Sequence, residues 1–194
     1  MDTTIIFIQG KAQHGKDTSA NAMTGWCNAH GKRSLTAHYG DYVKYIAGRY
    51  CGWNYVKDEA GRTLLQKLGT DIFRKTDPDF WVNAVANPLI TLNEVNALPY
   101  DYIFIPDVRF PNETARHWRK MGLLQPNWRA YDMRVRRPDF DNGLTEEQKQ
   151  HASETALDDY RCVTLTNTTL PDFNRLCWTF IDDIDHGVMR DLEV

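Results

Sequence analysis

The sequence has few cysteines, no long apolar run and no large excess of one charge. Its four cysteines are widely spaced and form no Cys-x-x-Cys pair, which argues against a disulfide framework or a zinc site and favours a reducing cytoplasm. The longest apolar runs are far too short to span a bilayer. A net charge of −3 gives no broad basic surface for a nucleic-acid polymer or an acidic membrane. No basic residue precedes the first apolar run, so we expect no secretion signal.

What the chain does have is an alternation of apolar runs and helical patterns over 194 residues, 42% of them hydrophobic. This length and composition suffice for a buried core. Helices alternating with strands predict an α/β fold, a parallel sheet flanked by helices, with ligands beyond the carboxyl ends of the strands. Strands are predicted at 4–8, 34–38, 100–106, 131–136 and 163–166, and helices at 18–29, 42–50, 62–74, 79–96, 112–121 and 170–186, with a short helix from 145.

The first predicted strand leads into Gly10-Lys-Ala-Gln-His-Gly-Lys-Asp-Thr18, whose glycines and lysine have the spacing of a phosphate-binding loop. Glycines let successive backbone N–H groups turn toward an anion. The helix that starts near Lys16 adds its positive end, and the lysine adds a charge for terminal phosphates. A Gly-rich turn that caps an ordinary helix is the alternative. The usual loop has Ser or Thr directly after the lysine, whereas here Asp17 stands there, either holding Mg²⁺ through water or capping the helix, and Thr18 follows.

A second cluster follows the predicted strand 100–106. Asp107 ends this strand, where phosphate-loop enzymes hold Mg²⁺ or its waters, and Arg109 could face the same cleft. The alternatives are a turn cap for Asp107 and a pair between Arg109 and Glu113. Because the phosphate loop falls at the same edge of the sheet, we favour a site.

Three arginines, Arg134, Arg136 and Arg137, end the fourth predicted strand. Arginine forks suit the charge that phosphoryl transfer spreads over oxygens, although a solvated strand end is the commoner role for any one of them. The polar stretch that follows would suit a mobile lid that excludes water. In the segment His151 to Glu154, no second His or Cys lies one turn away for zinc, so helix capping is the simpler interpretation from the residues alone.

A further group of polar residues lies between 41 and 81. Arg62 and Gln66 share a helical face and could bind an acceptor phosphate and a base edge; ordinary surface positions are the alternative. For the aromatics of this region, a place in the core is the alternative. The candidates are Asp41, Lys44, Arg62, Gln66, Arg74 and Trp81.

The segment Gly10–Thr18 resembles the phosphate loop of bacteriophage-type deoxynucleoside monophosphate kinases, where the Gly-Lys-Asp-Thr variant is familiar. Related adenylate kinases likewise lack a hydroxyl residue after the lysine and place a threonine one position later. The resemblance covers most of the chain, and its specificity lies in the combination, since the loop alone fits many ATPases. Further segments that look like this family, in the same order, are Gly61–Asp71, Asp77–Val82, Pro106–Glu113 and His151–Glu154.

The resemblance implies a P-loop nucleoside monophosphate kinase fold, one domain over 1–194 with an acceptor-binding helical insertion at about 39–96 and a lid at about 137–160. It implies Mg²⁺-assisted transfer of the γ-phosphate of ATP to a deoxynucleoside monophosphate, giving a diphosphate. The partners would be small nucleotides, with neither polymeric nucleic acid nor a membrane, in the cytoplasm, or the host cytoplasm if the chain is viral. The oligomeric state stays open, with a homodimer as one option.

The expected site residues then divide by role. The ATP phosphates would contact Gly10, Lys11, His14, Gly15, Lys16, Asp17 and Thr18, and Mg²⁺ would be held through water by Asp17 and Asp107. Lys16, Arg109, Arg136 and Arg137 would stabilise the transferring group, and the acceptor would contact Asp41, Lys44, Arg62, Gln66, Arg74, Trp81 and Arg109, with His151 and Glu154 as further substrate-site or lid residues. Two alternatives remain: another small-molecule kinase, acting on dephospho-coenzyme A or a ribonucleotide, and a nucleotide-binding module without transfer activity.

Overall fold

The computed structural model describes residues 2–189 and divides into two compact units. The first unit comprises the described residues up to Thr36 and from Pro99 onward, and the second comprises Ala37–Leu98. Within residues 2–189, no helix combines the length and the apolar character needed to cross a membrane.

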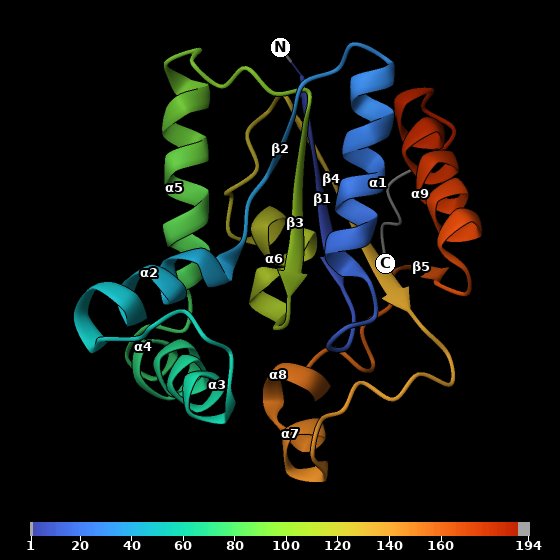
Figure 1. Ribbon diagram of the computed structural model, residues 1–194. Coiled ribbons are helices and arrows are strands. Elements are labelled where there is room, and N and C mark those ends of the chain that lie inside the picture. Colours follow the sequence, from blue (N-terminus) through green and yellow to red (C-terminus); the bar gives the residue numbers. More distant parts are fainter. Residues whose placement is uncertain (1, 190–194) are drawn as a thin grey trace. The chain divides into compact units, whose positions relative to one another are not determined.

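The first unit is built on a five-stranded parallel sheet (Figure 1). Its strands lie in the order β2-β3-β1-β4-β5, which places β1 in the centre, with Ile5 of β1 opposite Ile103 of β3 and Ala130 of β4. The predicted fold class, a P-loop-type parallel sheet flanked by helices, is confirmed. The strands are β1 (Thr3–Gln9), β2 (Ser34–Thr36), β3 (Tyr102–Val108), β4 (Trp128–Arg136) and β5 (Val163–Thr166).

Both faces of the central strand are covered, which explains why β1 is an unbroken buried run rather than an alternating one. Ile6 and Ile8 pack into a core with residues of α1 (Lys16–Ala29) and α9 (Leu170–Asp185), two helices that lie side by side in Figure 1. Successive side chains of a strand point to opposite faces. Phe7 accordingly packs on the other face, where its ring meets Trp118 of α6 (Ala115–Lys120) at 5.1 Å.

The short helices of this unit are defined by their caps. The helix predicted at 112–121 begins later than expected, because Asn112 lies within the 3₁₀ turn η2 (Pro111–Glu113). The cap of α6 is Thr114, whose hydroxyl accepts from the N–H of His117, because the turn delays the start of the helix. The short helix predicted from 145 is α7 (Glu146–Gln150), with Thr145 as its N-cap, and α8 (Ala152–Thr155) follows.

The second unit is entirely helical. A wide π-helical stretch, η1 (Lys67–Ile72), interrupts the helix predicted at 62–74, and Trp81 donates from Nε1 to the carbonyl of Gly69 there at 2.8 Å. The ring of Trp81 also contacts Phe73 and Phe80, with centroids 5.0 and 4.7 Å away. The role of this second unit as an acceptor-binding insertion stays a prediction. The α-helices are α2 (Tyr39–Cys51), α3 (Glu59–Gln66), α4 (Phe73–Thr76) and α5 (Phe80–Glu94).

Candidate active site

The loop between β1 and α1 has two backbone positions that require glycine. Gly10 has a φ of 149°, and a Cβ there would lie 2.4 Å from the carbonyl oxygen of Val135. Gly15 has a φ of 106°, and a Cβ there would lie 2.6 Å from Nδ2 of Asn167. Gly15 is also the N-cap of α1 and has no side chain with which to cover the first N–H groups of that helix. At these two positions the loop therefore has the tight backbone, without a Cβ, that an anion site needs.

Lys16 is the first residue of α1, and its side chain folds back against this loop. Its Nζ donates to the carbonyls of Gly10 at 2.8 Å and Lys11 at 2.9 Å, and the residue is only 7% exposed. Burial, together with the positive charge of Arg109, lowers the pKa of Lys16 to about 7. A phosphate group beside this ammonium would restore its charge, because an anion favours the protonated form.

Three carboxylates act on the same ammonium. The charge of Glu154, followed by those of Asp17 and Asp107, opposes the fall in the pKa of Lys16, so all three lie near it. Mg²⁺ prefers oxygen ligands and usually keeps several waters while it binds one or two carboxylates and substrate phosphates. Within residues 2–189, no group of three or more His, Cys, Asp or Glu side chains is arranged to hold a metal ion by itself. The donor set therefore fits Mg²⁺ shared with phosphates, not a site built from protein alone.

Arg109 follows β3, and its guanidinium forms an ion pair with the carboxylate of Glu154. It also donates to the carbonyl of Ser153 at 3.2 Å. The predicted alternative, a pair with Glu113, is wrong for the side chain. Glu113 Oε2 instead accepts from the backbone N–H groups of Arg109 at 2.6 Å and Phe110 at 3.0 Å. Glu113 thus fixes the backbone and leaves the guanidinium to reach the loop side.

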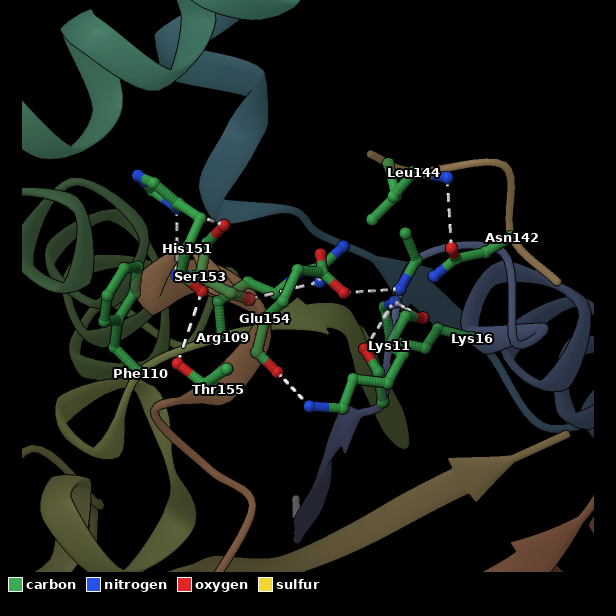
Figure 2. Close-up of polar contacts among 12 residues, drawn as sticks. Lys11, Lys16, Arg109, Phe110, Asn142, Leu144, His151, Ser153, Glu154 and Thr155 are labelled. Carbon is green, nitrogen blue, oxygen red and sulfur yellow. Dashed lines mark hydrogen bonds and ion pairs between the residues drawn. The ribbon is translucent and has the colours of Figure 1, made fainter. Parts of the chain in front are cut away.

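Glu154 joins Arg109 to the phosphate loop, as Figure 2 shows. Its Oε2 accepts from the backbone N–H of Ala12 at 2.9 Å, while its Oε1 pairs with Arg109. Lys11 reaches back, with its ammonium bonded to the carbonyl of Glu154 and to the carboxylate of Asp158. No local pattern around Glu154 predicts this contact, since the loop that it binds lies 142 residues away in the chain.

His14 connects the loop to the segment after β4. Its Nδ1 accepts from the backbone N–H of Arg137 at 3.3 Å, which leaves Nε2 to carry the proton of the neutral ring. Burial, followed by the charge of Lys16, lowers the pKa of His14. The guanidinium of Arg137 lies over the ring of Phe140 at 3.9 Å. The neighbouring Gln13 donates from Nε2 to the carbonyl of Asn142 at 3.0 Å.

The three arginines of β4 and its end differ in their surroundings. Arg134 donates to Oε1 of Gln9 at 3.3 Å and to the carbonyls of Leu157 and Tyr160 at 2.5 and 2.8 Å. The expectation that Arg134 donates to the transferring phosphoryl group needs correcting, because these bonds use its guanidinium to hold the chain at 157–160. Arg136 is exposed and lines a cavity of about 250 Å³ beside the loop. Other residues that line the cavity are Lys11, His14, Arg109, Glu154 and Asp158.

His151 has the capping role that its residues alone suggested. Its Nδ1 lies 2.9 Å from the hydroxyl of Ser153 and accepts from the N–H of that residue at 3.2 Å, which starts α8. A substrate contact for His151 stays a prediction. The cap places Ser153 and Glu154 beside Arg109.

The predicted acceptor residues of the second unit make short-range contacts. Asp41 pairs with Lys44 at 2.7 Å, and the exposed Arg62 donates from Nε to the carbonyl of Lys57 at 3.1 Å. Arg74 donates to the carbonyl of Pro78 at 3.4 Å. Gln66 is half-buried at the end of α3. The acceptor role of these residues stays a prediction.

Trp81 belongs to the core of the second unit. It is 1% exposed, and its indole N–H is already bonded to a carbonyl. This burial corrects the expectation that Trp81 contacts substrate and supports the alternative, a core position.

No protein-family model and no curated protein matches the chain. Among solved structures, the chain is similar to the APS kinase CysC of Mycobacterium tuberculosis in complex with AMPPNP and APS. The two share 11% identity with a TM-score of 0.45, over 95% of this chain and 98% of that one. A mutant of the same enzyme gives 10% identity and a TM-score of 0.43 over the same shares. Likeness this weak carries no argument about activity, so function must rest on the site itself.

Proposed function

We propose that the protein is an ATP-dependent phosphotransferase that phosphorylates deoxynucleoside monophosphates to diphosphates. The observation that carries the proposal is the charge arrangement around Lys16. A buried ammonium, the guanidinium of Arg109 and the carboxylates of Asp17 and Asp107 meet at a loop that two glycines hold open. This combination suits transfer of a phosphoryl group, which needs positioning and cationic donors.

The residues of the chain have separate tasks in this proposal. N–H groups of the loop hold the phosphates of ATP, and Lys16 and Arg109 donate to the oxygens on which charge develops. Bound Mg²⁺, held through water by Asp17 and Asp107, would neutralise charge on the β- and γ-phosphates. The acceptor phosphate is itself an anionic nucleophile near neutral pH, so no general base is required.

The segment 137–160 has the contacts that a lid over this site would use. Its first part meets the loop at Gln13 and His14, and its second part meets it at Lys11 and Ala12. Arg134 and the hydroxyl of Tyr160, which donates to Asp132 at 2.5 Å, hold the end of the segment to β4. We therefore propose that 137–156 moves over ATP while 157–160 stays fixed as its base. Arg136 and Arg137, at the other end, would then approach the transferring group.

The choice of a nucleoside monophosphate as acceptor rests on the resemblance of the motifs to the bacteriophage-type kinases. Dephospho-coenzyme A and ribonucleotides are the nearest alternatives, since the same loop serves many acceptors. A nucleotide-binding module without transfer is the alternative of a different class. Two cations, Lys16 and Arg109, lie beside one loop. This favours transfer over binding alone, because binding ATP does not need a second donor for an acceptor phosphate.

The test is an acceptor panel with γ-labelled ATP and Mg²⁺, covering all deoxy- and ribonucleoside monophosphates and dephospho-coenzyme A. The proposal predicts label in a deoxynucleoside diphosphate. Label in the phosphorylated product of dephospho-coenzyme A alone would identify the first alternative. Binding of ATP without ADP release for any acceptor would identify the second.

A further inference from the structure

The phosphate loop already holds an anion, and that anion belongs to the protein. The carboxylate of Glu154 accepts the N–H of Ala12, which lies between the two glycines that shape the loop. Its side chain is 8% exposed, so the contact is shielded from water. Backbone N–H groups in such a loop are the donors that phosphate oxygens bind.

The same carboxylate uses a second donor of the site. Its other oxygen pairs with Arg109, and the backbone carbonyl of Glu154 accepts from Lys11 (Figure 2). Asp158 adds a carboxylate to Lys11. The segment 154–158 thus accepts from the N–H of Ala12 and from two cations that line the cavity, Lys11 and Arg109. A ligand phosphate that needs any of these donors has to compete for it.

We propose that Glu154 is an internal competitor of ATP. Its carboxylate occupies the N–H of Ala12 in the phosphate loop until the phosphates of ATP displace it. The inference rests on the proposed function, because it assumes that ATP is the anion that enters the loop. Displacement lowers the apparent affinity for ATP, since only the fraction of molecules with Glu154 released can bind. It also frees the guanidinium of Arg109 for a phosphate, so this donor becomes available together with the substrate.

The opposing possibility is that Glu154 positions Arg109 during the reaction. Positioning would leave the ion pair intact when ATP is bound, and loss of the carboxylate would then weaken turnover without improving affinity. The bond to Ala12 favours competition, because a residue that served only to orient the guanidinium would not need to occupy a donor of the loop.

The test is equilibrium binding of ATP by isothermal titration calorimetry to wild type, Glu154→Gln and Glu154→Ala. Glu154→Gln keeps the shape but loses the charge, and Glu154→Ala removes the group. We expect the ATP dissociation constant to fall by about tenfold in Glu154→Ala and by less in Glu154→Gln. Glu146→Gln is the matched control. It removes the same charge from the same segment, at an exposed carboxylate that pairs with Lys149 and not with the loop, and its affinity should equal that of wild type.

Each outcome decides between the ideas. Equal or weaker ATP binding by both Glu154 variants, with thermal melts that show them folded, would overturn the proposal. Tighter binding by Glu146→Gln as well would also overturn it, because general charge would then explain the gain. If none of the four proteins bound ATP, the proposed function itself would fail, whereas unchanged binding with normal transfer would reject only the role of Glu154.

Discussion

The predicted site residues of the phosphate loop make contacts with distant parts of the chain, whereas Arg62 in the helical unit at 37–98 bonds to a near neighbour. In the loop, residues far apart in the chain converge. Ala12 bonds to Glu154, and the charges of Arg109 and Asp107 act on the pKa of Lys16. In the helical unit, by contrast, Arg62 bonds to a carbonyl five residues away, and its guanidinium is otherwise on the surface. The loop is thus prepared for an anion by its own fold. The acceptor role assigned to the helical unit depends on substrate chemistry that only kinetics can test.

The largest effect should come from the loop. Lys16→Ala should leave the fold intact and lower phosphoryl transfer by about a hundred- to a thousandfold, because removing one preorganised donor of a developing charge typically costs that much. Steady-state kinetics, with circular dichroism to check the fold, measures the loss. Lys120→Ala, at an exposed position at the end of α6, is the control and should keep full activity. Near-normal turnover in folded Lys16→Ala would remove the basis for the phosphate-loop assignment.

Arginine substitutions compare the two regions directly. Arg109→Ala and Arg62→Ala should each weaken use of the acceptor by about ten- to a hundredfold, because a charge-assisted pair between arginine and phosphate contributes roughly 1.5–3 kcal/mol. Replacement by lysine should recover little, since an ammonium cannot reproduce the bidentate geometry. Titrations of acceptor and of ATP measure the effect, with Arg49→Ala on the exposed end of α2 as control.

The result for Arg62 decides whether the helical unit belongs to the acceptor site. A higher ATP requirement with an unchanged acceptor requirement would assign that arginine to the other substrate. No change in either requirement would support the alternative that Arg62 is an ordinary surface residue.

A smaller effect should appear with pH. The pKa of Lys16 is about 7 in the folded protein, against a usual value of 10.5, so above pH 7 the free protein holds it mainly neutral. ATP needs the charged form, so binding should weaken by up to about tenfold per pH unit above 7. Between 7 and 10.5 the unfolded chain binds more protons at this position, so the contribution of Lys16 to stability rises with pH in that window.

Calorimetry in buffers with different ionisation enthalpies measures this proton directly. At pH 8 the terminal phosphate of ATP is already ionised, since its second pKa is about 6, so proton uptake would belong to the protein. We expect uptake of close to one proton per ATP. Zero uptake at pH 8 would contradict the expectation that Lys16 gains its proton when ATP binds.

How far the sequence predicts the molecule depends on how local each feature is. The loop could be predicted because its glycines and lysine act within nine residues, and a strand, a turn and a helix occur around them in order. Asp107 and Arg109 could be placed because parallel strands end at one edge of a sheet. Glu154 could not be placed against the loop, because its partner lies 142 residues away and no periodicity connects them.

Two further differences have the same cause. Arg134 sits in a cluster that suits phosphate, but its guanidinium is used by the carbonyls of Leu157 and Tyr160, which only tertiary structure brings near. Trp81 lies within Asp77–Val82, a segment that resembles a nucleotide kinase, yet the π-helical stretch at 67–72 offers its indole a carbonyl inside the core. In both cases the residue type was compatible with a site, and long-range packing decided otherwise.

The central claim is that the γ-phosphate of ATP ends on a nucleoside monophosphate. Phosphorus NMR of the protein with ATP, Mg²⁺ and a mixture of the deoxynucleoside monophosphates tests it directly, because monophosphates, diphosphates, triphosphates and free phosphate have separate signals. Transfer to a nucleoside monophosphate predicts that the ATP and monophosphate signals decline together while two diphosphates form for each ATP consumed. Growth of free phosphate without a new diphosphate, or unchanged ATP, would contradict it.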